Sequence, residues 1–144
     1  MQTDIELAGW VVAVDVEQTR ATYETISFGG WQKCSCSYCR NFGAVLDTVF
    51  PPEVLDFFSK VGIDPVKSAE VYEYGEVSPG TRAYGGEYYL WGTIVQEPSK
   101  DAQGTAEFRI RFRQPSPLAQ KEFRAEGSLC LRFDTQIPWV LNDE

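Results

Sequence analysis

The chain has 144 residues, of which 43% are hydrophobic and 14% are aromatic, which is enough for one domain with a sizeable buried core. Its formal net charge of −8 argues against general affinity for nucleic acid or an anionic membrane, because both need a positive field. The sequence contains no histidine, which excludes a Ser-His or Cys-His pair and any histidine metal ligand.

The N-terminal stretch "MQTDIELAGW" has no basic region and no long apolar run. We therefore expect no signal peptide and a cytoplasmic protein. The longest apolar run, "AGWVVAV", is too short to span a bilayer. In a reducing compartment, the four cysteines are expected to be thiols or metal ligands rather than structural disulfides.

The N-terminal part of the chain predicts a β-hairpin. The stretch "GWVVAVDVE" (9–17) is rich in β-branched residues, which favour a strand. The stretch "ATYETISF" (21–28) alternates along its length and predicts a second strand, joined to the first by a turn at Gln18 and Thr19. The glycine pair at 29–30 ends this pattern.

Two consecutive helices follow. Apolar side chains recur at helical spacing over residues 38–50, Ser37 is placed to cap the start, and Pro51 ends the helix. The second helix starts at residue 52 or 53, continues to 61, and is followed by Gly62 as a C-terminal cap. Its buried stripe is predicted to contain Leu55, Phe58 and Val61.

The remainder predicts four strands, at 69–77, 86–95, 106–114 and 128–134. The strand at 86–95 is apolar on both faces, which favours a central position. A short helix is expected within 116–127, with Ser116 as its cap and Pro117 first, and residues 140–144 are expected to fray. The order β-β-α-α-β-β-β-β predicts a single α+β domain over 1–144, a mainly antiparallel sheet of about six strands with an inserted helix pair.

Three cysteines fall within six residues in "KCSCSYCRNF", and three interpretations stay open. The first is a metal site, because Cys34, Cys36 and Cys39 are close enough to bind one tetrahedral ion such as zinc. Structural zinc takes four ligands, so the fourth would be Cys130, a carboxylate or a non-protein group. Cys130 alternates with the apolar residues of its strand, which leaves it available for that role.

The second interpretation is redox chemistry. Cys36 and Cys39 form a C-x-x-C at a helix start, where N–H groups lower a thiol pKa. The eleven residues "CSYCRNFGAVL" resemble the active-site turn of the glutaredoxin branch of thioredoxin-like proteins, and that resemblance implies Cys36 as the attacking thiol and Cys39 as the resolving thiol. The order of elements elsewhere departs from that fold. The third interpretation is packing, because Cys39 borders the apolar stripe of its helix.

A row of arginines is the second candidate site. In "AEFRIRFRQ" the apolar side chains alternate with three arginines, Arg109, Arg111 and Arg113. Arg132 lies on the polar face of another strand. If the two strands pair, the four guanidinium groups suit a small anionic ligand such as a carboxylate or phosphate. The alternative is a solvated sheet face whose arginines pair with Glu107, Asp134 and neighbouring acids.

The segments "CSCSYCRNF", "FPPEVLDFFSKVGIDPVKSAEVYEYG" and "YGGEYYLWGTIV" are together similar to a group of small bacterial proteins of uncharacterised function. The resemblance covers most of the chain, implies a bacterial, cytoplasmic, single-domain protein, and supplies no mechanism. The sequence thus favours a non-enzymatic domain that binds a ligand or partner, with a cysteine cluster that is structural or binds zinc. The alternatives are a thiol-disulfide oxidoreductase using Cys36 and Cys39, and an acidic protein that binds a basic partner protein.

Overall fold

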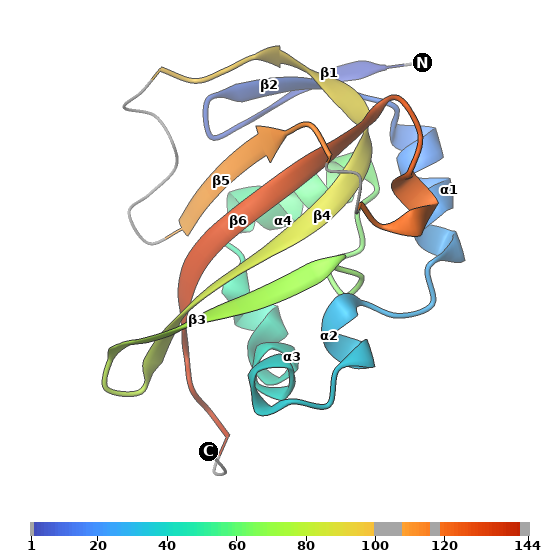
Figure 1. Ribbon diagram of the computed structural model, residues 1–144. Helices are drawn as coiled ribbons and strands as arrows, with labels where there is room; N and C mark the ends of the chain where they lie inside the picture. Colours follow the sequence, from blue (N-terminus) through green and yellow to red (C-terminus); the bar gives the residue numbers. More distant parts are fainter. Residues whose placement is uncertain (1, 100–107, 116–118, 142–144) are drawn as a thin grey trace.

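The α+β architecture predicted from the sequence is confirmed (Figure 1). The computed structural model describes residues 2–99, 108–115 and 119–141. Within these ranges the strands are β1 (Thr3–Leu7), β2 (Trp10–Val14), β3 (Glu70–Ser78), β4 (Thr81–Gln96), β5 (Phe108–Arg113) and β6 (Ser128–Pro138). The helices are α1 (Val16–Thr25), α2 (Gly30–Lys33), α3 (Ser37–Val49) and α4 (Pro52–Val61), and η1 (Lys121–Phe123) is a single 3-10 turn.

The strands form one antiparallel sheet in the order β1-β2-β4-β6-β5, with β3 also paired to β4. β4 is 16 residues long and is the central strand, as its apolar character on both faces predicts. β6 pairs with one edge of β4, while β3 and β2 pair with successive parts of the other edge. α3 and α4 lie behind this sheet in Figure 1, and α1 and α2 lie beside it.

Two side chains of α1 and the backbone N–H of Asp15, the residue before the helix, complete the edge of β4 between β3 and β2. At Tyr89, the Tyr23 hydroxyl donates to the carbonyl oxygen (2.6 Å) and accepts from the amide N–H (3.2 Å). At Trp91, the amide N–H donates to Thr19 Oγ1 (3.1 Å), and the carbonyl oxygen accepts from the Asp15 N–H (2.8 Å). Buried backbone groups need partners, so α1 takes the place of a strand along this short stretch.

The prediction of a strand at 21–28 is wrong, because most of that segment belongs to α1. The first hairpin is formed instead by β1 and β2, so the strand predicted at 9–17 is found over 10–14 but has a different partner. Its turn is at Ala8 and Gly9, both of which have positive φ (52° and 86°). The β1 segment lacks the run of β-branched residues that identifies β2, which explains why it was missed.

The sequence does carry a start signal for α1. The Asp15 side chain caps the helix by accepting from the Gln18 N–H (3.0 Å). Thr19 and Tyr23 are four residues apart and are the buried positions of the helix. Their hydrogen bonds to β4 are tertiary contacts, and these outweigh the strand propensity of the β-branched and aromatic residues in this segment.

The inserted helix pair is confirmed at the predicted positions. Gly62 adopts the left-handed conformation (φ 88°) and ends α4, as expected. The predicted buried stripe of α4 is partly wrong, because Leu55 is 39% exposed. The observed stripe has i, i+3, i+4, i+7 spacing and consists of Val54, Phe57, Phe58 and Val61.

The two faces of the sheet differ in character. The face toward α3 and α4 is an aromatic core in which Phe50, between the helices, packs edge-on against Phe58, Tyr88 and Phe133. On the opposite face, Phe123 of η1 packs on Tyr89 and Trp91 at ring-centroid distances of 6.0 and 5.2 Å. That face also carries Arg111 and Arg113 of β5 and Arg132 of β6, and it lies toward the viewer in Figure 1.

The helix expected within 116–127 is reduced to the η1 turn in the described residues. Its predicted cap and first residue, Ser116 and Pro117, lie outside those residues, as do the last three residues of the tail predicted to fray. No helix in the described ranges has the length and apolar content needed to cross a membrane.

Candidate functional site

The loop between α2 and α3 carries the three clustered cysteines. Cys34 directly follows α2, and Cys36 is the N-cap of α3, a role that the sequence analysis gave to Ser37. Cys39 lies in the first turn of α3 and is buried, whereas Cys34 and Cys36 are exposed. The local fold therefore places two solvent-accessible thiols beside one that is anchored in the protein.

The helices on either side of this loop are fixed by tight contacts. The Trp31 indole N–H donates to the Val66 carbonyl oxygen (3.0 Å), and its ring covers Gly43 of α3. A Cβ atom at Gly43 would lie 2.3 Å from that ring, so only glycine allows this approach. Asn41 is fully buried and links α3 to the end of β6, donating to the Pro138 carbonyl oxygen (3.1 Å). These contacts fix α2 and α3 in place, and so fix both ends of the cysteine loop between them.

The three sulfur atoms all lie within 4.8 Å of one another. The Cys34 thiol donates to Cys36 Sγ at 3.0 Å. Backbone groups also point at the sulfurs: the Cys36 N–H donates to Cys34 Sγ (3.4 Å), and the Cys39 N–H donates to Cys36 Sγ (3.5 Å). Hydrogen bonds of this kind favour a thiolate over a thiol, so the geometry suits negatively charged sulfur.

The cluster contains thiols of opposite character. The hydrogen bond from Cys34 lowers the pKa of Cys36, and the N–H of Cys39 adds to this effect. Burial raises the pKa of Cys39 to about 12, and its hydrogen bonds with Cys34 and Cys36 act in the same direction. Cys36 is therefore the thiolate most easily formed, while Cys39 loses its proton readily only when another positive charge replaces it.

Cys130 does not join this group among the described residues. It is fully buried in β6, opposite Tyr89 and Arg113, and burial raises its pKa to about 11. The first turn of α3 meets the sheet elsewhere, where the Tyr84 hydroxyl donates to the Tyr38 carbonyl oxygen (2.8 Å).

Tyr84 is opposite Thr135 in the sheet. Cys130 is five residues from Thr135 along β6, or about 17 Å at 3.3–3.4 Å per residue. The structure therefore does not bring Cys130 to the other three cysteines, because Cys130 is buried and lies far along the sheet from the cysteine loop.

The arginine row lies on the polar face of the sheet, and the alternation of β5 is as predicted. Arg113 and Arg132 form ion pairs with Glu87, whose side chain is only 6% exposed. Arg132 also pairs with Asp134 (3.3 Å), and Arg111 lies 4.0 Å from the same carboxylate. The predicted pairing with Asp134 is thus observed, while Glu107 lies outside the described residues.

The fourth arginine of the row, Arg109, is exposed and opposite Asp134 in the strand register. Buried Glu87 was not identified from the sequence, because Arg113 and Arg132, which pair with it, lie on other strands. Anion binding by Arg109, Arg111, Arg113 and Arg132 stays a prediction, and the carboxylates in their midst reduce the positive charge available to a ligand.

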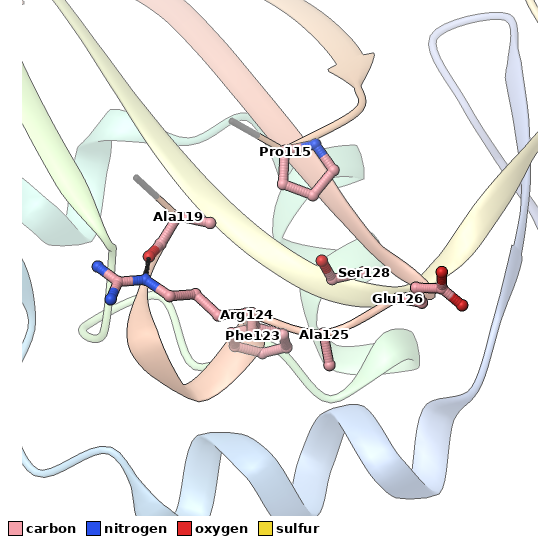
Figure 2. Close-up of a pocket in the computed structure, with 7 residues that line it drawn as sticks. All are labelled: Pro115, Ala119, Phe123, Arg124, Ala125, Glu126 and Ser128. Atoms are coloured by element: carbon pink, nitrogen blue, oxygen red, sulfur yellow. Dashed lines mark hydrogen bonds between the residues drawn. The ribbon is translucent and has the colours of Figure 1, made fainter. Parts of the chain in front are cut away.

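Two cavities adjoin η1: residues 115–128 line the first, and segments far apart in the sequence line the second. The first has a volume of about 430 Å³ and is shown in Figure 2. Its lining is mostly apolar, with the buried Ser128 hydroxyl on one side and Glu126 near its edge. Arg124 also lines it, but Figure 2 shows the guanidinium group extending past Ala119, away from Ser128.

The second cavity shares Ala119 and Arg124 with the first and extends toward α2 and the start of β3.

Comparison of the chain with protein-family models, with curated proteins and with solved structures finds no match.

Proposed function

We propose that this protein is a small binding domain that holds a thiophilic metal ion, such as zinc, through Cys34, Cys36 and Cys39. The mutual approach of the three sulfurs within 4.8 Å carries this proposal. In a tetrahedral zinc site with Zn–S bonds of 2.3 Å, neighbouring sulfurs are about 3.8 Å apart. The observed Cys34–Cys36 separation of 3.0 Å and the 4.8 Å limit bracket that value, so small side-chain rotations suffice to bind the ion.

The surroundings of the sulfurs support metal binding in a second way. A metal ion binds thiolates, so binding releases protons and grows stronger as pH rises. The Cys39 N–H directed at Cys36 Sγ stabilises negative sulfur at Cys36 before the ion arrives. The raised pKa of Cys39 means that its proton is exchanged for the metal ion and is not lost beforehand.

Three protein ligands leave one tetrahedral position for another group. Among the described residues, the cluster of candidate ligands contains these three cysteines only. Because Cys34 and Cys36 are exposed, the fourth position is accessible to water, a small ligand or a donor atom from a partner protein. This favours a binding role over a purely structural one, in which four protein ligands normally close the site.

Metal analysis of protein purified without chelator tests the proposal. We expect about one zinc ion per chain, lost in Cys34→Ser, in Cys36→Ser and in Cys39→Ser. Cys130→Ser is the matched control and should keep its zinc, because Cys130 lies elsewhere in the sheet. Absence of bound metal at any added zinc concentration, or loss of zinc in the control alone, contradicts the proposal.

A thiol-disulfide exchange function is the second candidate, favoured by the lowered pKa of Cys36 at the start of α3. The Cys36 thiolate would attack a substrate disulfide RSSR, forming a mixed disulfide and releasing one thiolate RS⁻. Cys39, after losing its proton, would then attack Cys36 Sγ, forming the Cys36–Cys39 disulfide and releasing the second thiolate. The raised pKa of Cys39 slows this second step, which is why we place the redox function second.

Alkylation separates the two functions. The redox candidate requires Cys36 in the metal-free protein to react with iodoacetamide well below the pH of an ordinary thiol, and Cys36→Ser to abolish the reduction of a disulfide substrate. An unshifted alkylation profile for Cys36 rejects this candidate and leaves the metal proposal unaffected.

A further inference from the structure

We propose that the cavity between α2 and η1 binds a small aromatic anion that also carries an N–H or O–H donor. Its volume is about 360 Å³, within the range of small-ligand sites. Four segments far apart in the sequence line it: residues 28–33, 68–70 and 119–124, together with Tyr89 of β4. No cysteine lines it, so this proposal does not depend on the metal site.

Two polar groups lining the cavity have no partner within the described part of the chain. Ser68 is fully buried, and its hydroxyl oxygen forms no hydrogen bond there. Gln120 Oε1 is also buried and also lacks a donor. Buried polar groups in native proteins are normally satisfied, so each of these indicates a missing partner. Because Oε1 can only accept, the occupant must supply an N–H or O–H group.

Positive charge around the cavity selects an anion. Lys33, Lys121 and Arg124 line it, against the two carboxylates of Glu70 and Glu122. Neither lysine forms an ion pair with any of the residues that the structure describes, so both ammonium groups are available. The chain as a whole has a net charge of −8, so this excess of positive charge is confined to the surroundings of the cavity.

Glu70 offsets less of this positive charge than an ordinary glutamate would. Burial raises the pKa of Glu70, Glu87 raises it further, and Lys33 acts in the opposite direction, so Glu70 is more readily protonated than an ordinary glutamate. The Arg124 Nε–H donates to the Ala119 carbonyl oxygen, which fixes the side chain so that its terminal groups extend past Ala119 (Figure 2). A carboxylate or sulfonate can then accept from these terminal N–H groups and from the lysines.

Aromatic side chains supply the apolar surface. The Phe28 side chain lines the cavity and is 56% exposed, which is unusual for so large an apolar group. Tyr89 lines it as well and is held in place by stacking on Phe123. A planar ring bound between these walls would cover Phe28 and leave its charged group at the lysines.

The probe for this proposal is 4-aminobenzoate, which combines an aromatic ring, a carboxylate and an amine donor. Binding is followed by two-dimensional NMR of the ¹⁵N-labelled protein. We expect saturable shifts confined to residues 28–33, 68–70 and 119–124, with binding about tenfold weaker or more for benzoate, which lacks the donor, and for aniline, which lacks the anion.

Variants locate the site. Ser68→Ala and Lys121→Gln should each weaken 4-aminobenzoate binding about tenfold, and the NMR spectrum shows directly whether each variant is folded. Lys60→Gln is the matched control, because Lys60 is an exposed lysine of α4 outside this cavity. Cys34→Ser should leave 4-aminobenzoate binding unchanged whether or not the metal proposal holds. Absence of saturable shifts, shifts outside these segments, or equal affinity in wild type and Ser68→Ala overturns the inference.

Discussion

Replacing Tyr23 by phenylalanine should destabilise the protein far more than removing one hydroxyl usually does. The Tyr23 hydroxyl serves both backbone groups of Tyr89, donating to its carbonyl oxygen and accepting from its N–H, and Tyr23 is 2% exposed. Tyr23→Phe leaves two buried backbone groups without partners. At about 1–3 kcal/mol for each of the two unsatisfied groups, we expect a loss of about 2–6 kcal/mol in the free energy of unfolding.

Urea denaturation followed by circular dichroism measures this loss, and Tyr88→Phe is the matched control. Tyr88 is equally buried in the same core, but its hydroxyl makes a single hydrogen bond, to the Pro65 carbonyl oxygen (2.6 Å). The control should cost about 1 kcal/mol. If Tyr23→Phe costs no more than Tyr88→Phe at an unchanged m-value, then α1 does not complete the edge of β4 and the reasoning is refuted.

Three further predictions concern pH, packing and charge. Burial raises the pKa of Tyr84 to about 12 and raises those of Tyr23, Tyr88 and Tyr89 as well. The unfolded chain releases these protons first, so stability is full below about pH 10 and falls as pH rises above it. Ultraviolet titration should show these four tyrosines ionising well above pH 10 or together with unfolding. Ionisation of all seven tyrosines near pH 10 in the folded state would contradict this. Gly43→Ala places a methyl group against the Trp31 ring and should cost about 1–3 kcal/mol in thermal or urea unfolding, whereas Ala44→Ser on the same helix should be nearly neutral. Glu87→Gln removes the carboxylate between Arg113 and Arg132 and should lower the free energy of unfolding by about 1–3 kcal/mol, a range kept low because Arg113 is half exposed. Asp56→Asn, in an exposed pair with Lys60, is the control and should cost under about 0.5 kcal/mol. Equal costs would show that burial of Glu87 is unimportant.

The helix pair could be predicted from the sequence because its signals are local. Apolar spacing, the prolines at 51 and 52, and Gly62 define α3 and α4 without reference to the rest of the chain. The strict alternation of β5 is equally local, since every second residue is an arginine. In each case, the pattern within one segment was enough to identify the element.

α1 could not be predicted in the same way. Its β-branched and aromatic residues favour a strand, and the contacts that stabilise the helix are made by Thr19 and Tyr23 with β4, about 70 residues away along the chain. The candidate sites show the same division. The proximity of Cys34, Cys36 and Cys39 follows from their spacing, whereas the position of Cys130 and the cavity beside η1 depend on how distant strands pair.

Cobalt(II) titration of the metal-free protein tests the central claim most directly, because sulfur-to-cobalt charge transfer in the near ultraviolet reports thiolate ligands. We predict saturation at one ion per chain, a tetrahedral visible spectrum, and displacement of cobalt by zinc. The charge-transfer band should weaken or disappear in Cys34→Ser, Cys36→Ser and Cys39→Ser, and should be unchanged in Cys130→Ser. A weak octahedral spectrum without charge transfer, or a band that persists in all three cluster variants, would contradict the account.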